Sequence, residues 1–301
     1  MRRITEDSAQ SIISKYATLI FDCDGVLWRG RQIIAGAPPA ISHLRGLHKT
    51  LLFLTNNSTH SRIHLQQKFA DFGFKVQTDE LLGSAFLLAH LLRQRIDPSE
   101  NSWVYVVGRQ GIVDELQNVK IQAFGLEDDG HVFDFETFAG PSDWSSRQVT
   151  AVVVGFDHHF NYTKTAKAMH YLRNPQCLFL ATNMDATFPD THGPLPGTGS
   201  VVRSIEEACG RAAHVVGKPN PLVLEAIRSL KPSIDPKTTL MVGDRMDTDV
   251  AFGKACGIDT LLVESGVSLE SEVVDLPLSL QPEYIASSIA ILGPAISTRI
   301  H

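Results

Sequence analysis

Short apolar runs alternate with segments of helical periodicity along most of the chain. The first run, "ATLIFD" at residues 17–22, is apolar on both faces, which is typical of a strand in a parallel sheet covered by helices. Predicted strands are 17–22, 50–56, 102–108, 149–157, 177–183, 213–218, 239–244 and 260–266. Predicted helices are 38–49, 61–73, 81–96, 110–118, 161–173, 199–210, 220–230, 248–257 and one near 282–292. This alternation predicts an α/β fold with a doubly wound, mostly parallel, Rossmann-like sheet.

The same pattern predicts two domains. Residues 1–90 and 213–301 form the predicted core, and residues 91–212 form a second α/β domain, a cap, inserted between them. The polar stretch 126–148 is predicted to be a loop with one short extra element.

Composition narrows the class of protein. The chain has 301 residues, 43% of them hydrophobic and 20% charged, which suits a globular protein with a sizeable core. Its net charge is −6, and acidic and basic residues are interspersed. The sequence therefore shows no basic cluster of the kind that binds nucleic acids, and we expect no nucleic-acid partner. Four scattered cysteines predict neither a disulfide framework nor a zinc site. No signal-peptide pattern and no apolar run of about 18 residues is seen, so we expect a cytoplasmic protein without a membrane partner.

Polar residues that could take part in catalysis or ligand binding follow four of the predicted core strands. They are Asp22 and Asp24, then Thr55, Asn56 and Asn57, then Lys218, and finally Asp244 with Asp249. Taken singly, each has an ordinary explanation as a turn former, a helix cap or a solvated lysine. Ligands of open α/β sheets bind beyond the carboxyl ends of the strands, where all of these residues would meet. Their joint occurrence therefore predicts one site.

The residue types at this site suit phosphoryl transfer. Carboxylates and a carbonyl form an oxygen-only ligand set that favours Mg²⁺, and no histidine or cysteine cluster nearby favours zinc. A hydroxyl group and backbone amides at a helix start can bind phosphate oxygens, and a lysine can stabilise the charge that develops on them. The sequence has no Walker-type "GxxxxGK[ST]" motif, which excludes a P-loop enzyme.

Four motifs of the chain resemble those of a known superfamily. The stretches "DCDGVLW", "LTNNS", "GKP" and "GDRMDTD", in this order, resemble the motifs of the haloacid dehalogenase superfamily of aspartate-nucleophile phosphatases. The insertion between the second and third motifs matches the subgroup with a large α/β cap. Within it, residues 17–267 resemble the group of 4-nitrophenyl phosphatases, phosphoglycolate phosphatases and pyridoxal phosphatases.

The resemblance implies a role for each motif residue. Asp22 would be the nucleophile that forms an aspartyl-phosphate and also a metal ligand. Asp24 would be the general acid and base, and its backbone carbonyl would be a second ligand. Asp244 would complete the Mg²⁺ ligands, and Asp249 would order metal-bound water from behind. The phosphate would be held by four residues, Thr55, Asn56, Asn57 and Lys218.

The cap bears on the substrate. Its loop at residues 181–199 resembles the substrate-specificity loop of this group, so its candidates for contact with the leaving group are Asn183, Met184, Asp185 and Phe188. Simple packing explains Met184 and Phe188 equally well. Phe188 stands where pyridoxal-type members carry histidine, which favours 2-phosphoglycolate-like small acids, with 4-nitrophenyl phosphate as a substrate in vitro.

Two other functions stay open from the sequence. One is hydrolysis of pyridoxal 5′-phosphate, and the other is a non-catalytic regulatory protein that binds a phosphate ligand. A cap that restricts access favours a small phosphorylated metabolite as the partner. The resemblance also suggests a homodimer.

Overall fold

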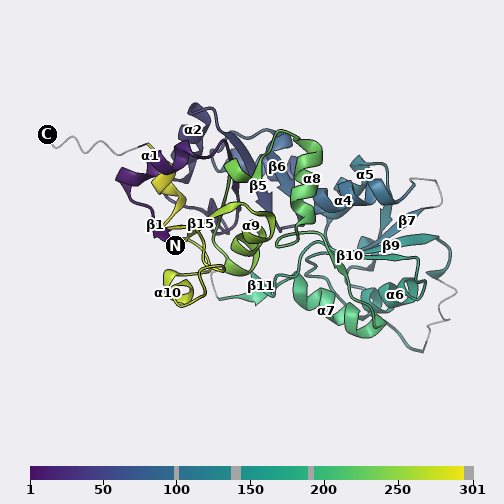
Figure 1. Cartoon of the computed structure of the whole chain (residues 1–301). Helices are drawn as coiled ribbons and strands as arrows, with labels where there is room; N and C mark the ends of the chain where they lie inside the picture. Colours follow the sequence, from purple (N-terminus) through teal and green to yellow (C-terminus); the bar gives the residue numbers. More distant parts are fainter. Residues whose placement is uncertain (98–101, 137–143, 189–192, 295–301) are drawn as a thin grey trace.

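The chain folds around two parallel sheets. The structure is a computed structural model and describes residues 1–97, 102–136, 144–188 and 193–294. The larger sheet has seven strands in the order β1-β16-β15-β14-β2-β5-β6, and the smaller has five in the order β13-β10-β9-β7-β8. All pairings within these two sheets are parallel. Figure 1 shows them as separate parts of the molecule, which confirms the predicted α/β core with an inserted α/β cap.

The core sheet is covered by helices on both faces. Its strands are β1 (Arg2–Arg3), β2 (Thr18–Phe21), β5 (Thr50–Thr55), β6 (Leu81–Gly83), β14 (Thr239–Gly243), β15 (Asp259–Val263) and β16 (Tyr284–Ala286). Helices α1 (Glu6–Ser14), α2 (Ala37–Gly46) and α3 (Arg62–Asp71) pack on one face. Helices α4 (Ser84–Arg95), α8 (Leu222–Leu230) and α9 (Ala251–Cys256) pack on the other. A short helix, α10 (Glu270–Val273), and a hairpin of β3 (Trp28–Arg29) and β4 (Gln32–Ile33) complete the core.

The cap repeats this arrangement on a smaller scale. Its strands are β7 (Trp103–Val107), β8 (Gln122–Phe124), β9 (Val149–Val154), β10 (Leu178–Ala181) and β13 (His214–Val215). Helices α6 (Tyr162–Leu172) and α7 (Thr198–Cys209) cover one face, and α5 (Gln110–Asn118) lies on the other. A hairpin of β11 (Thr187–Phe188) and β12 (Leu195–Pro196) extends from it toward the core.

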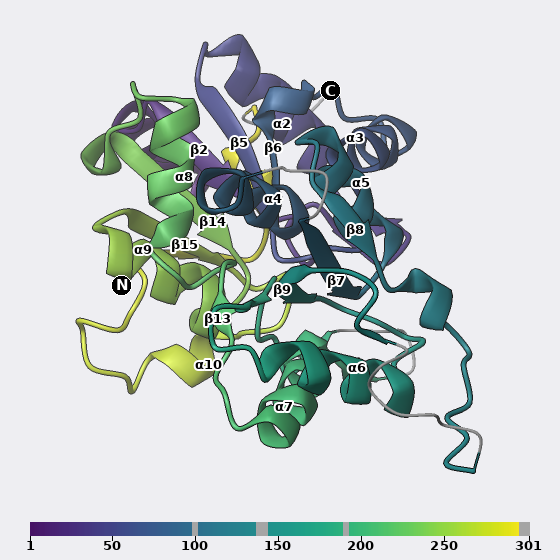
Figure 2. The same ribbon diagram turned by 90° about the vertical axis from the view of Figure 1, so that its right-hand side faces the viewer.

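One apolar cluster joins the two domains. It contains Leu54 of the core sheet, Leu88 of α4, Ile112 of α5 and Val153 of the cap sheet, and all four are buried. Figure 2 shows α4 and α5 between the strands β6 and β7. Alternate residues of a strand point to opposite faces, so Val106 of β7 joins this shared cluster whereas Tyr105 and Val107 pack under α6 and α7. The inner face of the cap sheet is therefore part of the main core.

Three predicted elements were wrong. Residues 81–96 are not one helix, because the apolar residues Leu81–Gly83 pair with β5 as a strand before α4 begins. The segment 213–218 is not a core strand, because His214–Val215 pair with β10 of the cap sheet. The segment near 282–292 is not a helix, because Tyr284–Ala286 pair with β15 and β1, and only a 3₁₀ turn at Ile289–Leu292 follows.

The remaining predictions concern the polar loop, elements near the N-terminus and the domain boundaries. A 3₁₀ turn at Leu126–Asp128 is the short extra element in the predicted loop, part of which (137–143) lies outside the described residues. The helix α1 and the strand β1 were not predicted. The domain boundaries after residues 90 and 212 stay a prediction, and the first falls within α4. Among the described segments, no helix is long and apolar enough to cross a membrane.

Replacing Leu88 by alanine should lower the free energy of unfolding by about 2–5 kcal/mol, because it opens a cavity in the shared cluster. Urea unfolding measures this. The control Ile63→Ala removes an aliphatic side chain that is 64% exposed on α3, and should change stability by less than about 0.5 kcal/mol. Equal, small effects of both would show that the cluster is loosely packed.

Candidate active site

Three buried carboxylates meet at the carboxyl ends of two neighbouring strands. Asp22 follows β2, and its backbone N–H donates to Val242 of β14 at 2.9 Å. Asp244 follows β14, and Asp249 lies on the single π-helical turn Met246–Val250 that comes next. One oxygen atom of each of the three carboxylates lies within 4.8 Å of the others. The predicted convergence of these strand ends is what the structure shows.

A single lysine neutralises part of this acidic cluster. The Nζ atom of Lys218 lies 2.6 Å from Oδ1 of Asp22 and 2.7 Å from Oδ1 of Asp249, and it also donates to the Leu54 carbonyl at 3.1 Å. Burial lowers the pKa of Lys218, but the charges of the two carboxylates outweigh it and hold the pKa above its usual value. Lys218 is therefore a fixed positive charge at the centre of the site.

Lys218 reaches this place from a linker and not from a core strand. It follows β13, which is the last strand of the cap sheet. Its backbone N–H donates to Oδ1 of Asn56 at 3.0 Å, and Nδ2 of Asn56 donates to its carbonyl at 3.2 Å. The amide of Asn56 thus clamps the returning chain to the end of β5. The sequence predicted that Lys218 lies near the acids, as it does, but placed it after a core strand, whereas it follows a strand of the cap sheet.

Asp244 is enclosed tightly on one side and unpartnered on the other. A Cβ atom added to Gly266 would lie 1.8 Å from Oδ2 of Asp244, and one on Gly25 would lie 2.3 Å from it. Gly25 also has φ +91°, a backbone conformation that only glycine adopts readily. The Val267 N–H donates to Oδ2 at 2.8 Å, whereas the buried Oδ1 has no hydrogen-bond partner among the described residues. An orphaned carboxylate oxygen of this kind calls for a cation.

The charge balance of the cluster points the same way. Burial raises the pKa of Asp22 well above its usual range; the charge of Lys218 opposes this, and the charges of Asp249 and Asp244 add to it. Burial, together with the charge of Asp249, raises the pKa of Asp244 to about 7. A bound divalent cation favours ionised carboxylates, so the oxygen-only donor set fits such an ion.

Asp249 differs from the other two acids because both of its oxygens already accept hydrogen bonds. Oδ1 is bound to Lys218, and Oδ2 accepts from the backbone N–H groups of Asp244 and Arg245, both at 3.1 Å. It therefore orders the loop and the lysine rather than offering a free ligand atom.

Asp24 lies beside the acidic cluster and outside it. Its side chain is 38% exposed, and Oδ1 accepts a hydrogen bond from Nε1 of Trp28 at 2.8 Å. The Nζ atom of Lys68 lies 3.9 Å from the same oxygen. Sequence reasoning gave no role to Trp28 or Lys68, because their spacing to Asp24 carries no signal of its own.

The last residue of β5, Thr55, and the two that follow it differ in what they offer to a ligand. Asn56 is engaged with Lys218, and Oδ1 of Asn57 caps its own turn by accepting from the backbone and hydroxyl of Thr59, at 2.9 and 2.6 Å. Oγ1 of Thr55 accepts from the Asn57 N–H at 3.1 Å. Its hydroxyl proton has no acceptor in the described part of the chain, so Thr55 can donate to a phosphate oxygen.

The cap loop touches the core through two of its four candidate residues. Nδ2 of Asn183 donates to the Asn56 carbonyl at 2.8 Å, and Oδ1 of Asp185 accepts from Nδ2 of Asn56 at 3.0 Å. Burial raises the pKa of Asp185. Met184 packs against the apolar cluster under α6 and α7, and Phe188 packs edge to face on Phe156 with 5.1 Å between ring centroids.

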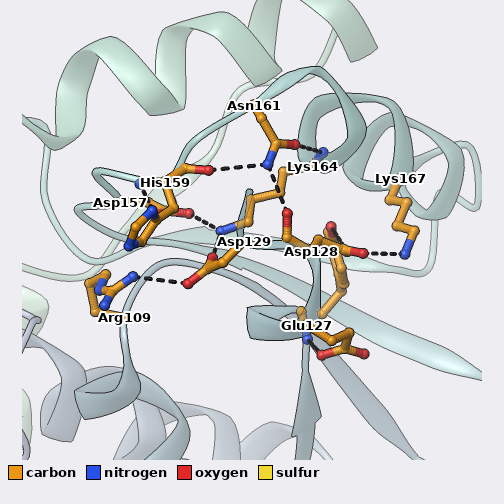
Figure 3. Close-up of polar contacts among 11 residues, drawn as sticks. Arg109, Glu127, Asp128, Asp129, Asp157, His159, Asn161, Lys164 and Lys167 are labelled. Atoms are coloured by element: carbon orange, nitrogen blue, oxygen red, sulfur yellow. Dashed lines mark hydrogen bonds and ion pairs between the residues drawn. The ribbon is translucent and has the colours of Figure 1, made fainter. Parts of the chain in front are cut away.

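A buried ion-pair network holds the neighbouring cap loops together (Figure 3). Nζ of Lys164, a fully buried side chain, lies 2.5 Å from Oδ2 of Asp157 and also bonds to Asp129. Arg109, which directly precedes α5, pairs with the same Asp129 at 3.0 Å. Nδ2 of Asn161 donates at 2.8 Å to the backbone carbonyl of Asp128, the residue before Asp129. The network fixes the loop after β9, which carries Phe156.

Comparisons with known proteins agree with this geometry. A family model described as haloacid dehalogenase-like hydrolase matches residues 19–122, and a second HAD-like hydrolase model matches residues 215–292. Glycerol-3-phosphate phosphatase of Gallus gallus is 39% identical, covering 98% of this chain and 96% of the relative. The chain belongs to the haloacid dehalogenase-like hydrolases. It is a phosphomonoesterase of the class with an aspartate nucleophile, and its cap is inserted between the second and third motifs.

Further members resemble the chain over nearly its whole length. Human chronophin is 39% identical, with 96% of both chains covered. Among solved structures, the p-nitrophenyl phosphatase from Archaeoglobus fulgidus has a TM-score of 0.77 at 28% identity, covering 92% of this chain and 98% of its own. A glycerol phosphate phosphatase from Mycobacterium tuberculosis, solved in complex with magnesium, has a TM-score of 0.77 at 29% identity, covering 94% and 78%.

Replacing Lys164 by methionine should lower the free energy of unfolding by about 3–5 kcal/mol, because it leaves the buried Asp157 without its cation and Asp129 with Arg109 alone. Urea unfolding at neutral pH measures this. The control Arg203→Met on α7 removes a cap cation that is 74% exposed, and should cost less than about 1 kcal/mol. A Lys164 variant as stable as the control would show that the network does not support the cap.

Proposed function

We propose that the protein is a Mg²⁺-dependent phosphatase of small phosphomonoesters that acts through an aspartyl-phosphate on Asp22. The observation that carries this proposal is the position of Asp22, buried between the ammonium of Lys218 and the orphaned oxygen-ligand cluster around Asp244. Oδ1 of Asp22 is engaged with Lys218, and no described residue hydrogen-bonds to Oδ2. That second oxygen is the nucleophile.

The residues divide the reaction between them. Oδ2 of Asp22 attacks phosphorus, the bond from phosphorus to the leaving oxygen breaks, and Asp24 gives that oxygen a proton. Asp24 then takes a proton from water as the water oxygen attacks the aspartyl-phosphate and frees inorganic phosphate. The hydroxyl of Thr55 donates to a phosphoryl oxygen in both steps, and the positive charge of Lys218 stabilises the negative charge of the phosphoryl group.

The ligand set for the cation follows from the free atoms. Asp22, Oδ1 of Asp244 and the backbone carbonyl of Asp24 would hold Mg²⁺, with Asp249 ordering the loop behind them. When bound, Mg²⁺ would supply positive charge that offsets the carboxylates and the substrate phosphate. The magnesium complex of the mycobacterial glycerol phosphate phosphatase supports magnesium as the ion.

The cap restricts the substrate to a small molecule. The relatives named glycerol-3-phosphate phosphatase support a short phosphorylated substrate. We favour 2-phosphoglycolate and similar short phosphate esters, including glycerol 3-phosphate. Pyridoxal 5′-phosphate is the second candidate. The chain's membership of an enzyme family disfavours a non-catalytic phosphate-binding protein.

Replacing Asp22 by asparagine should reduce turnover roughly a thousandfold or more, because it removes the attacking oxygen. Phosphate release would be measured on 2-phosphoglycolate, glycerol 3-phosphate, pyridoxal 5′-phosphate and 4-nitrophenyl phosphate. Wild-type activity on the preferred substrate should vanish with EDTA and return with Mg²⁺.

The matched control is Asp247→Asn. This acid lies in the same loop as Asp244, but its side chain is 66% exposed and pairs with Arg245. Its loss should leave turnover within about threefold, as expected for an exposed ion pair. Full activity of Asp22→Asn, or metal-independent turnover, would refute the mechanism.

Replacing Phe188 by histidine should raise kcat/KM for pyridoxal 5′-phosphate relative to 2-phosphoglycolate about tenfold, since one new hydrogen bond to a charged partner is worth about 1.5–3 kcal/mol. Phe188→Leu is the control for lost ring packing on Phe156 and should not shift the ratio. A ratio unchanged by Phe188→His would remove this residue from the specificity determinants.

A further inference from the structure

Trp28 returns to Asp24 through a closed turn. The Cys23 carbonyl accepts from the Leu27 N–H at 2.9 Å, and the Gly25 N–H donates to the Trp28 carbonyl at 2.7 Å. This turn brings residue 28 back beside residue 24, and the indole Nε1 donates to Oδ1 of Asp24 at 2.8 Å. An indole N–H is a donor only, so the hydrogen bond has one direction.

The indole has no freedom to leave this position. Trp28 is fully buried, and its ring is met edge to face by Phe69, Phe72 and Phe74 at centroid distances of 4.8, 5.3 and 6.1 Å. Lys68 closes the remaining side with its Nζ atom 4.4 Å from the centre of the ring. Trp28 is thus a rigid donor, held by α3 and the residues that follow it.

The contact between Trp28 and Asp24 borders a small cavity. Asp24 and Trp28 line a small cavity together with Thr55, Asn57 and Lys68, so the donor to phosphate and the exposed carboxylate face one space. Oδ1 of Asp24 is taken by Trp28, and Lys68 lies 3.9 Å from the same atom. Within the described residues, no hydrogen bond is made to Oδ2.

We propose that Trp28, supported by Lys68, is a positioning residue that fixes one oxygen of Asp24 so that the other exchanges protons with the leaving group. This inference rests on the proposed function of Asp24. The proton moves from Oδ2 to the leaving oxygen as the bond to phosphorus breaks and its electron pair stays with that oxygen. A proton from the attacking water later restores Oδ2. Without Trp28 the carboxylate turns freely and the proton is delivered less often.

The consequence is a dependence on the leaving group. An oxygen that departs as a basic anion needs the proton during bond breaking, whereas 4-nitrophenolate is stable enough to depart without it. Loss of the Trp28 hydrogen bond should therefore slow poor leaving groups selectively. A purely structural role of Trp28 would slow all substrates alike.

The experiment compares phenyl phosphate with 4-nitrophenyl phosphate, two substrates of similar shape whose leaving groups differ in basicity. The quantity measured is kcat/KM, which includes steps only up to departure of the leaving group and not the later hydrolysis. In Trp28→Phe, kcat/KM for phenyl phosphate should fall about tenfold, which is a part of the roughly 10²–10⁴ that general acid catalysis contributes in full. For 4-nitrophenyl phosphate it should fall less than about threefold.

Two further variants make the result specific. Phe72→Leu loosens the packing of the same indole without removing its N–H, and should affect both substrates equally. Lys68→Met should shift the substrate ratio in the same direction as Trp28→Phe, by a smaller factor, and Lys68→Arg should restore it. Lys68→Met also provides the test if Trp28→Phe does not fold.

An equal loss on both substrates in Trp28→Phe, or an unchanged ratio in Lys68→Met when the tryptophan variant does not fold, would overturn the proposal. Failure of the proposed function gives a different result, because wild type would then hydrolyse neither ester in the presence of Mg²⁺.

Discussion

The ammonium group of Lys218 is the interaction on which the site depends. It lies buried between Asp22 and Asp249, and removing it would leave both carboxylates inside the protein without their cation. The lysine comes from the linker that follows the last cap strand, and the side chain of Asn56 pairs with its backbone on both sides. The linker that returns the chain from the cap to the core therefore also supplies the positive charge beside the nucleophile.

A single lysine does not balance three carboxylates, and the structure distributes the remaining charge unevenly. Both oxygens of Asp249 accept hydrogen bonds, one from the lysine and the other from two backbone N–H groups, so the protein stabilises its charge. Asp244 keeps one oxygen without a partner, and glycines on two loops crowd its other side. The fold has thus fixed the positions of the acids in advance, which lowers the cost of organising them when a cation and a phosphate arrive.

Much of this organisation could be predicted from the sequence. Strands buried on both faces, such as β2 and β14, are unmistakable apolar runs, and the acids that follow them must meet at one sheet edge. Short strands could not be assigned correctly. The strand Leu81–Gly83 runs directly into an apolar helix, so the sequence pattern does not separate the two. The sheet to which His214–Val215 belongs depends on the strand it pairs with, which the local sequence does not reveal. The partners of Lys164 and Trp28 were equally hidden. Asp129 lies 35 residues before Lys164, and no periodic pattern links the two.

The apolar cluster shared by the core and the cap limits which segments of the chain can be replaced by those of a relative. A chimaera that replaced only residues 91–212 would cut through α4 and would seat a foreign α5 and cap sheet on Leu54 and Leu88 of this chain. Interiors packed at crystal-like density tolerate such mismatches poorly. Diversification of the cap is therefore expected to be confined to the loops at its strand ends and to the β11–β12 hairpin, while α4, α5 and the inner cap strands change together with the core.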